Sequence, residues 1–345
     1  MSVKQKDNPG TTRWGRVRRR LRWVLGGLLA LVVLTVVGVK ATDAVMTARE
    51  RDAHAAPGEL VEVDGHTMHV AVSGSGDTTV VLLPGLGTAA PVLDFEPLTR
   101  ELSTWATVAV VEPFGYGWSD ATDDPMLPSD VAADVQKALD AAGVDGPVVM
   151  AAHSIGGLYA QAFADAYPER TVAVVGLDPT MPRTDDVLPA SEKEEDPFAD
   201  PIPASIELLA RGGWVRVMQA IGGDDPQMFS GATQAQGYSE ENLALQTTVS
   251  NWSAVSSNVV WQAAHLEEAV DEVRDLTFSP DVPVLVFTAD PAGERPAWRD
   301  AASTDYLRGS GCARDVPLVG EHYVHHEHAA EISAQIESFL AECLG

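Results

Sequence analysis

The sequence predicts an α/β protein with a mostly parallel central sheet flanked by helices. Short apolar runs rich in β-branched residues alternate with helical segments, and such runs are typical of parallel strands buried on both faces. We expect strands at 80–83, 107–111, 148–151, 172–177, 284–288 and 316–320. This alternation predicts right-handed crossovers that place helices over both faces of the sheet.

The elements between and before these runs fit the same architecture. Residues 129–142 predict a crossover helix, because Val131, Val135 and Leu139 fall on one side of it. At the front, the runs 60–63 and 66–72 flank Asp64-Gly65, which is a hairpin turn signal. The parallel sheet is therefore expected to begin with an antiparallel pair.

Ser154 is the candidate nucleophile. It lies in Ala152-His153-Ser154-Ile155-Gly156, between the apolar run 148–151 and a helical stretch. A serine hydroxyl needs a base to take its proton and a turn that holds it clear of the backbone. A sharp strand-to-helix turn does this only if small residues stand two places on either side, as Ala152 and Gly156 do.

The chain resembles the α/β-hydrolase family from about residue 60 to its C-terminus. The resemblance rests on the Ser154 turn, on the strand order, on the glycine-rich segment 112–120 and on Gly320-Glu321-His322-Tyr323-Val324. It implies the α/β-hydrolase fold, with a helical cap inserted between late strands. It also implies catalytic residues in the order serine, acid, histidine. Epoxide hydrolases and haloalkane dehalogenases of this fold use an aspartate nucleophile, which Ser154 excludes.

By this resemblance His322 is the general base and Asp290 is the acid that orients it. Asp290 directly follows the run 284–288, where the family places its acid. The competing candidates are Asp178, which follows the run 172–177 where some members place theirs, and then Glu294 and Asp305. The acid would hold the imidazole tautomer and stabilise the imidazolium.

The oxyanion of an acyl-transfer reaction needs preorganised donors. The resemblance assigns this role to the backbone amides of Ile155 and Leu86. The loop at 84–87 reads Pro-Gly-Leu-Gly, where most relatives have His-Gly. Because the donor is a backbone amide, this difference changes the support of the loop and leaves the chemistry intact.

Histidines crowd the segment after His322, at 325, 326 and 328. Imidazoles suit zinc, copper and nickel, but the ligand spacing typical of such sites is missing. We therefore expect no metal and no organic cofactor, and we expect a polar, partly solvated start to the helix 329–344. His153 is expected to be a packing residue that points away from Ser154.

About a hundred residues separate Asp178 from the run at 284, too many for a plain crossover. We assign residues 181–275 to the cap, and residues 59–180 and 276–345 to the core. The cap is expected to have a loop at 182–203 and helices at 205–221 and 240–274. Its apolar mass comes from tryptophan, methionine and phenylalanine side chains, namely Trp214, Met218, Met228, Phe229, Trp252 and Trp261.

The N-terminus predicts a membrane anchor. Residues 23–39 are uncharged and mostly apolar, and as a helix they would span about 26 Å, close to the hydrocarbon thickness of a bilayer. Residues 1–22 form a basic tail, 23–40 the transmembrane helix and 41–58 a linker. The arginines before the helix predict a cytoplasmic N-terminus and an extracytoplasmic catalytic domain. The alternative is a cleaved signal peptide, with Arg19-Arg20 and Thr42-Asp43-Ala44 as its landmarks.

The charge of the chain restricts its partners. The net charge is −27, and beyond residue 40 there are 49 acidic and 14 basic residues, a net charge of −35. Such a surface argues against nucleic acid and favours neutral, apolar esters over anionic ones, unless arginines such as Arg211, Arg216 and Arg295 reverse the local field. Cys312 and Cys343 either pair or remain as two thiols.

Two functions fit these observations. The first is a membrane-anchored serine hydrolase, esterase-like or lipase-like, that cleaves a small-molecule ester or related acyl substrate. The second is a ligand-binding protein that keeps the fold and the triad without appreciable turnover.

Overall fold

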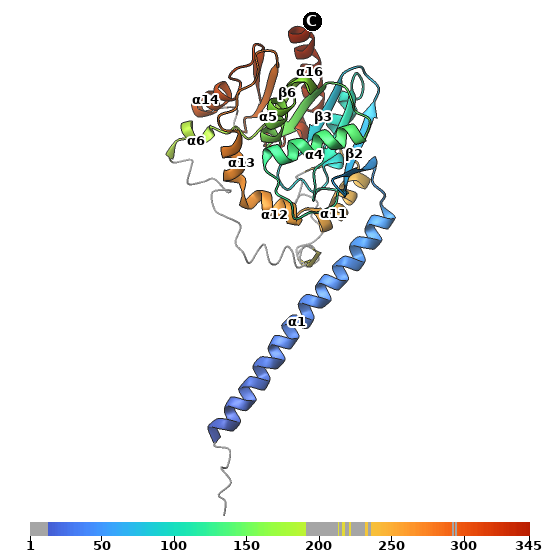
Figure 1. Ribbon diagram of the computed structural model, residues 1–345, viewed down its shortest axis with the longest axis vertical. Helices are drawn as coiled ribbons and strands as arrows, with labels where there is room; N and C mark the ends of the chain where they lie inside the picture. The colour runs from blue at the N-terminus through green and yellow to red at the C-terminus, as the bar shows by residue number, and fades with distance from the viewer. Residues whose placement is uncertain are drawn as a thin grey trace, which may run out of the picture.

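The computed structural model describes residues 13–190, 213, 216–217, 221, 232–233, 236–291, 293 and 295–345. Its centre is an eight-stranded sheet in the order β1-β2-β4-β3-β5-β6-β7-β8, with helices on both faces (Figure 1). β2 is antiparallel to β1 and to β4, and every other neighbouring pair is parallel. The predicted α/β class and the leading antiparallel pair are both confirmed.

The strands lie close to the predicted runs. Their bounds are β1 Glu59–Val63, β2 His66–Gly74, β3 Thr79–Leu83, β4 Thr107–Glu112, β5 Val148–His153, β6 Thr171–Leu177, β7 Val284–Ala289 and β8 Ala313–Leu318. β5 and β7 are buried at every position, which explains why they read as continuous apolar runs. β8 begins three residues before its prediction, because its partly exposed edge position lets it carry Arg314 and Asp315.

Two apolar layers cover the two faces of the sheet. On one face α4 (Pro128–Ala141) and α5 (Gly156–Ala166) pack against alternate strand residues such as Val81, Val111 and Met150. On the other face α3 (Glu96–Leu102) and α16 (Ala329–Leu344) pack against the intervening residues, such as Leu82 and Val149. The shorter elements are α2 (Pro91–Asp94), η1 (Pro168–Arg170), α6 (Thr184–Val187), α14 (Ala297–Tyr306) and α15 (Val324–Glu327).

The described part of the cap consists mainly of three helices between β6 and β7. These are α11 (Glu240–Ser253), α12 (Ser257–Ala264) and α13 (Leu266–Val273), so the helical prediction for 240–274 is confirmed. Of the predicted loop at 182–203, residues 182–190 are described. The rest of that loop and most of the predicted helix at 205–221 lie outside the described residues, as do Arg211, Trp214, Met218, Met228 and Phe229.

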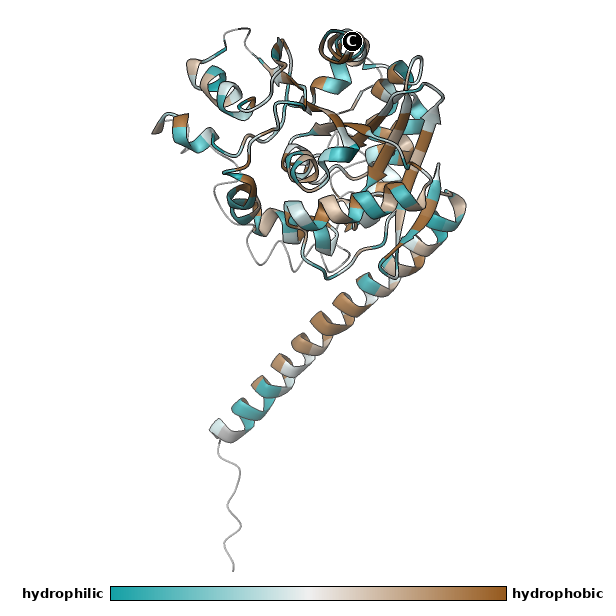
Figure 2. Ribbon diagram, turned by 45° about the horizontal axis from the view of Figure 1, so that its top comes forward, coloured by the Kyte–Doolittle hydropathy of each residue, from teal (hydrophilic) through white to brown (hydrophobic). Residues whose placement is uncertain are grey.

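The N-terminal helix α1 runs from Arg13 to Ala53 without interruption and extends away from the domain (Figure 1). Within the described residues it is the one helix that is long and apolar enough to cross a membrane, and no residue of its most apolar window is buried. Figure 2 shows this apolar stretch in the middle of the helix, between two more polar ends. The residues predicted as a linker, 41–58, continue the helix as far as Ala53.

Cys312 and Cys343 form a disulfide. The bond joins the residue that precedes β8, at the edge of the sheet, to the last turn of α16, which covers one face of the sheet. The sequence left this pairing open, because two cysteines in a chain of this size carry no information on their separation in space.

Candidate active site

Ser154 occupies the turn between β5 and α5, in a left-handed backbone conformation with φ of 54°. Its backbone amide donates to the Leu177 carbonyl oxygen over 3.3 Å, and its carbonyl oxygen accepts from Thr180 over 2.8 Å. A residue other than glycine rarely adopts this conformation, and such strain is concentrated at functional sites. The turn therefore has the backbone geometry expected of a nucleophile elbow, and its hydrogen bond to Leu177 ties it to the end of the neighbouring strand β6.

The small residues around Ser154 are required by the close approach of the loop after β3. A Cβ atom on Gly156 would lie 2.8 Å from the Pro84 carbonyl oxygen. A Cβ atom on Gly85 would lie 3.0 Å from the Cβ of Ser154 and 2.6 Å from Nδ1 of His153. The Pro84-Gly85 loop and the elbow thus fit together only because both carry glycine at the contact.

His322 is paired with Asp178. The imidazole Nδ1 of His322 lies 2.6 Å from the Asp178 carboxylate Oδ2, the distance of a charge-assisted hydrogen bond. The assignment of Asp290 as the orienting acid is therefore corrected, and Asp178, at the end of the preceding strand of the sheet, takes the position beside His322. Asp290 instead extends the pairing of β7 with β8, since its amide donates to the Leu318 carbonyl oxygen over 2.8 Å.

The reason for this difference is the geometry of neighbouring strand ends. β6 and β7 are parallel neighbours, so Asp178 and Asp290 both follow the C-terminal ends of their strands, on the same side of the domain. Asp178 has a left-handed φ of 46°, which marks a sharp change of chain direction at that residue. The two remaining candidate acids are not placed beside His322: Asp305 forms ion pairs with Arg183 and Arg308, and Glu294 lies outside the described residues.

The surroundings of Asp178 favour its ionised form. Burial alone would raise its pKa, but the hydrogen bond to His322, the charge of Arg299 and the Ala289 amide together lower it below its ordinary value. Arg299 donates to Asp178 Oδ1 over 3.1 Å, and the Ala289 amide donates to the same oxygen over 3.0 Å. A carboxylate in this state accepts the Nδ1–H of His322 and leaves Nε2 as the basic nitrogen.

The imidazole of His322 is half exposed, with 50% of the side chain accessible. In the described chain no hydrogen bond joins its Nε2 to the Ser154 hydroxyl, and bonds of this kind often tighten only when substrate is bound. Below it lies His153, which is buried and has its Nε2 3.2 Å from the His322 carbonyl oxygen. The rings of His153 and His322 are 4.6 Å apart, so the buried His153 packs against the imidazole of His322, and its expected packing role is confirmed.

The two amides expected to form an oxyanion hole belong to Ile155, which directly follows Ser154, and to Leu86, in the loop after β3. In the residues that the structure describes, neither the Leu86 nor the Ile155 amide donates to another protein group. Next to Leu86, the Gly87 amide lies 3.4 Å from the Tyr116 hydroxyl, which donates to Gln262 of α12 over 2.5 Å. The cap helix thereby supports the loop that carries Leu86.

The histidine segment after His322 differs from its prediction. His325 and His326 are buried, and their Nε2 atoms each lie 2.8 Å from a different oxygen of Asp94. The predicted polar, partly solvated helix start describes only His328, which is partly exposed and lies 2.9 Å from the Val319 carbonyl oxygen. His325 and His326 are buried because Asp94, a buried acid at the end of α2, binds both imidazoles. Asp94 lies far from this segment in the sequence.

Burial and pairing shift the pKa values of Asp94, His325 and the neighbouring His153. Burial opposes the ionisation of Asp94, but the two imidazoles outweigh it and hold the pKa of Asp94 well below its ordinary value. Burial lowers the pKa of His325 to about 4, against the opposing effect of Asp94. Burial also lowers the pKa of His153 well below its ordinary value. At neutral pH the cluster thus has a carboxylate that accepts from two imidazoles.

Asp94, His325 and His326 are also the described residues whose positions suit a metal ion, since their ligand atoms lie within 4.8 Å of one another. Their present contacts satisfy the carboxylate fully, because each of its oxygens has an imidazole partner. The cluster also packs on the active site, since the His325 ring lies 4.9 Å from the His153 ring. We therefore interpret Asp94 as a residue that positions the segment carrying His322.

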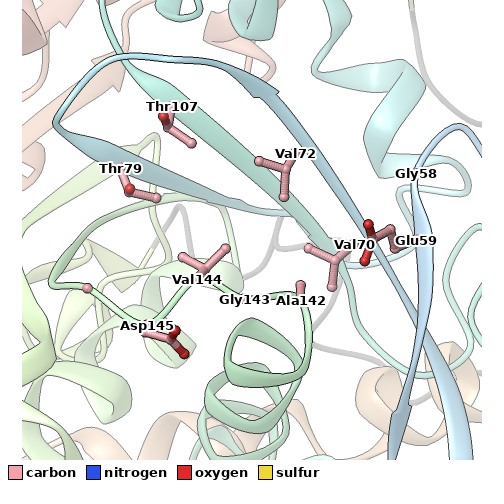
Figure 3. Close-up of a pocket in the computed structure, with 11 residues that line it drawn as sticks. Gly58, Glu59, Val70, Val72, Thr79, Thr107, Ala142, Gly143, Val144 and Asp145 are labelled. Carbon is pink, nitrogen blue, oxygen red and sulfur yellow. The ribbon is translucent and has the colours of Figure 1, made fainter.

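A cavity of about 650 Å³ lies elsewhere in the molecule (Figure 3). It is lined by the first residues of β3 and β4, Thr79 and Thr107, by Val70 and Val72 of β2, and by the loop after α4. Thr79 and Thr107 lie at the N-terminal ends of parallel strands, whereas Ser154, Asp178 and His322 follow the C-terminal ends. The cavity therefore holds none of the candidate catalytic residues.

Three residues of the site carry no signal in the sequence. Asp94, Gln262 and Arg299 lie in segments of unremarkable composition, and each acts through a contact over more than a hundred positions along the chain.

Comparison with known proteins agrees with this geometry. A sequence model described as "Alpha/beta hydrolase family" matches residues 80–335. A strand-to-helix serine turn and a histidine–aspartate pair at the ends of later strands define the general class of α/β hydrolases. The match covers most of the chain, and the protein belongs to the alpha/beta hydrolase family.

Individual relatives are more distant. The uncharacterized protein YbdG of Bacillus subtilis is 33% identical over 163 residues, which are 47% of this chain and 50% of that protein. The chain thus matches half the length of this relative. The epoxide hydrolase VrEH1 of Vigna radiata is 21% identical, with a TM-score of 0.62 over 82% of this chain and 97% of the other. An esterase of Thermogutta terrifontis is 18% identical, with a TM-score of 0.57 over 82% and 97%. These two structures establish the fold.

Proposed function

We propose that this protein is a membrane-anchored serine hydrolase that cleaves an ester or a related acyl bond through an acyl-enzyme intermediate. The observation that carries the proposal is Ser154 in a left-handed elbow, next to strand ends that bear the His322–Asp178 pair. A serine nucleophile and a histidine–carboxylate pair are the groups that acyl transfer requires.

The reaction follows from the roles of these groups. His322 Nε2 takes the proton of the Ser154 hydroxyl as its oxygen attacks the acyl carbonyl carbon. The amides of Leu86 and Ile155 bind the oxyanion of the tetrahedral intermediate. The intermediate collapses to an acyl-serine as His322 returns the proton to the departing alcohol. Water then attacks the acyl-serine in the same way and releases the carboxylic acid, while Asp178 holds Nδ1–H throughout.

The fold neighbours include proteins of two chemistries, and the nucleophile favours one of them. Epoxide hydrolases of this fold attack with an aspartate, whereas position 154 is a serine in this chain. A fold neighbour described as an esterase therefore fits the residue at the elbow better than one described as an epoxide hydrolase.

Three features support an extracytoplasmic domain on a single-pass anchor. No part of the apolar stretch of α1 is buried against the domain, which leaves it free to contact lipid. Six arginines precede it, which favours a cytoplasmic N-terminus. The Cys312–Cys343 disulfide suits an oxidising compartment. Release of a soluble protein trimmed near Ala44 would show a cleaved signal peptide instead.

Labelling with a fluorophosphonate tests the central assignment. We expect Ser154 to be labelled, and Ser154→Ala to lose both labelling and ester hydrolysis without a change in thermal stability. Ser129→Ala, at an exposed site on α4, is the matched control and should retain both. Labelling that persists in Ser154→Ala would contradict the nucleophile. Tight binding of an ester without turnover would favour a ligand-binding protein.

A further inference from the structure

α1 joins the apolar anchor and the domain in one rigid element. The helix continues without a break from its apolar stretch into residues that contact the domain. Because an unbroken helix transmits orientation along its length, the contacts made by residues after Lys40 decide which face of the domain points toward the membrane.

Arg216 of the cap makes the first of these contacts. Its guanidinium donates to Asp43 over 2.8 Å, to Thr47 over 2.8 Å, and to both carboxylate oxygens of Glu50 over 2.6 and 2.7 Å. These three partners are spaced four and three residues apart, so they lie on one face of α1. The Arg216 side chain is only 11% exposed. The partners outweigh the effect of burial and raise the pKa of Arg216 above its ordinary value.

Arg51 makes a second contact near the end of α1. Its guanidinium lies 5.5 Å from the ring centre of Trp252 in α11 and donates to the Trp118 carbonyl oxygen over 3.4 Å. In return, the Trp118 indole donates to the His54 carbonyl oxygen over 2.9 Å. The end of α1 is therefore fixed both to the cap and to the core loop that follows β4.

These contacts put the cap next to the point where the helix leaves the membrane. Asp43 follows Lys40 by three residues, which is about 4.5 Å along a helix, and a Cβ atom on Gly213 would lie 2.8 Å from Asp43 Cβ. Figure 1 shows α1 leaving the domain on the side of α11 and α12. The same cap helices cover the active-site loops, since Ser253 donates to the Ala89 carbonyl oxygen and Val259 lies 4.0 Å from the Cβ position of Gly87.

We propose that Arg216 and α1 hold the cap against the membrane surface, and that the substrate of the hydrolase is an uncharged lipid ester drawn from the bilayer. This inference rests on the proposed hydrolase function and on the anchor. The charge of the chain selects the class of lipid, because a net charge of −35 beyond residue 40 repels anionic head groups. With the cap against the membrane, an acyl chain taken from the bilayer reaches the active-site loops from the side that α11 and α12 cover.

The test compares two esters with the full-length protein in phosphatidylcholine vesicles. One is 4-nitrophenyl palmitate, which resides in the bilayer, and the other is soluble 4-nitrophenyl butyrate. A flexible insertion of ten glycine and serine residues after Lys40 keeps the anchor but uncouples it from the domain. Arg216→Ala removes the contacts between the cap and α1. Arg308→Ala, at an exposed arginine paired with Asp305, is the matched control.

We expect the insertion to lower turnover of the palmitate ester about tenfold, and Arg216→Ala to lower it about threefold. Turnover of the butyrate ester should stay unchanged in both, as should every activity of Arg308→Ala. Unchanged palmitate turnover in the insertion variant would overturn the inference, as would wild-type protein that hydrolyses only butyrate. Absence of turnover for both esters would instead contradict the proposed function.

Discussion

The ends of β6 and β7 lie side by side in the sheet, and each carries an aspartate. Asp178 at the end of β6 turns sharply, with φ of 46°, and pairs with His322. Asp290 at the end of β7 continues the strand and pairs its backbone with β8. Both residues are aspartates at the C-terminal ends of neighbouring strands, and both are buried. They differ in the direction that the chain takes after them. Backbone direction at the strand end therefore decides which acid meets the histidine.

The largest expected effect comes from exchanging these two acids for amides. Asp178→Asn should lower kcat/KM by about a thousandfold to ten-thousandfold, because His322 would lose the partner that fixes its tautomer. Asp290→Asn should lower it less than about tenfold. Steady-state hydrolysis of a 4-nitrophenyl ester measures both variants. A larger loss in Asp290→Asn would restore the assignment made from sequence.

Asp94→Ala tests whether the histidine segment could reach Asp290 if it were released. The substitution leaves two buried imidazole N–H groups without acceptors and should lower the free energy of unfolding by about 3 kcal/mol or more. Urea unfolding measures this change. Asp94→Asn should cost less, because an amide accepts from one imidazole and donates to the other after a tautomer shift.

If Asp94→Ala frees His322 to pair with Asp290, adding Asp290→Asn to that variant will remove its residual activity. We expect no such dependence, because β7 keeps Asp290 engaged with β8. Full stability in Asp94→Ala would contradict the positioning role of Asp94.

A pH series tests the effect of burial on His325. The pKa of His325 is about 4 in the folded protein, against an ordinary value of 6.5. Between these values the unfolded chain binds more protons, so stability is full above about pH 6.5 and falls as the pH approaches 4. The loss from this residue is on the order of 3 kcal/mol. Urea unfolding at pH 7 and pH 4 should show a smaller difference in His325→Gln, and an equal difference would refute this account.

The smallest effects are expected from two arginines that form hydrogen bonds near the ends of β6 and β7. Arg299 bonds Asp178, so Arg299→Ala should lower kcat/KM about fivefold, which is about 1 kcal/mol. Arg295 bonds Thr288 and Ser303 over 2.6 and 2.8 Å, on the β7 side. Arg295→Ala should lower the melting temperature by a few degrees and leave kcat/KM of the folded protein unchanged. An equal loss of kcat/KM in both variants would contradict the assignment of the kinetic effect to the β6 end alone.

Much of the fold follows from the sequence, because buried parallel strands leave a continuous apolar signal. The runs at 80–83 and 284–288 fall within β3 and β7, and the serine turn is visible from its two small neighbours. The choice between Asp178 and Asp290 does not follow, because both spacings satisfy the same strand order. The role of Asp94 does not follow either, since its partners lie more than two hundred positions away. The local sequence pattern predicts helices, strands and turns. Contacts between segments that are distant in the sequence can be identified only from the folded structure.

The disulfide between Cys312 and Cys343 encloses the segment that carries His322. The two cysteines are 31 positions apart, so β8, the histidine segment and α16 form one covalent ring. Val319 in this ring is exposed, and a protease that cuts there would open the backbone without releasing either piece. The disulfide would keep the piece that carries His322 joined to the rest of the chain. It would migrate as two fragments only after reduction, so an intact band under non-reducing conditions would not by itself show an intact backbone.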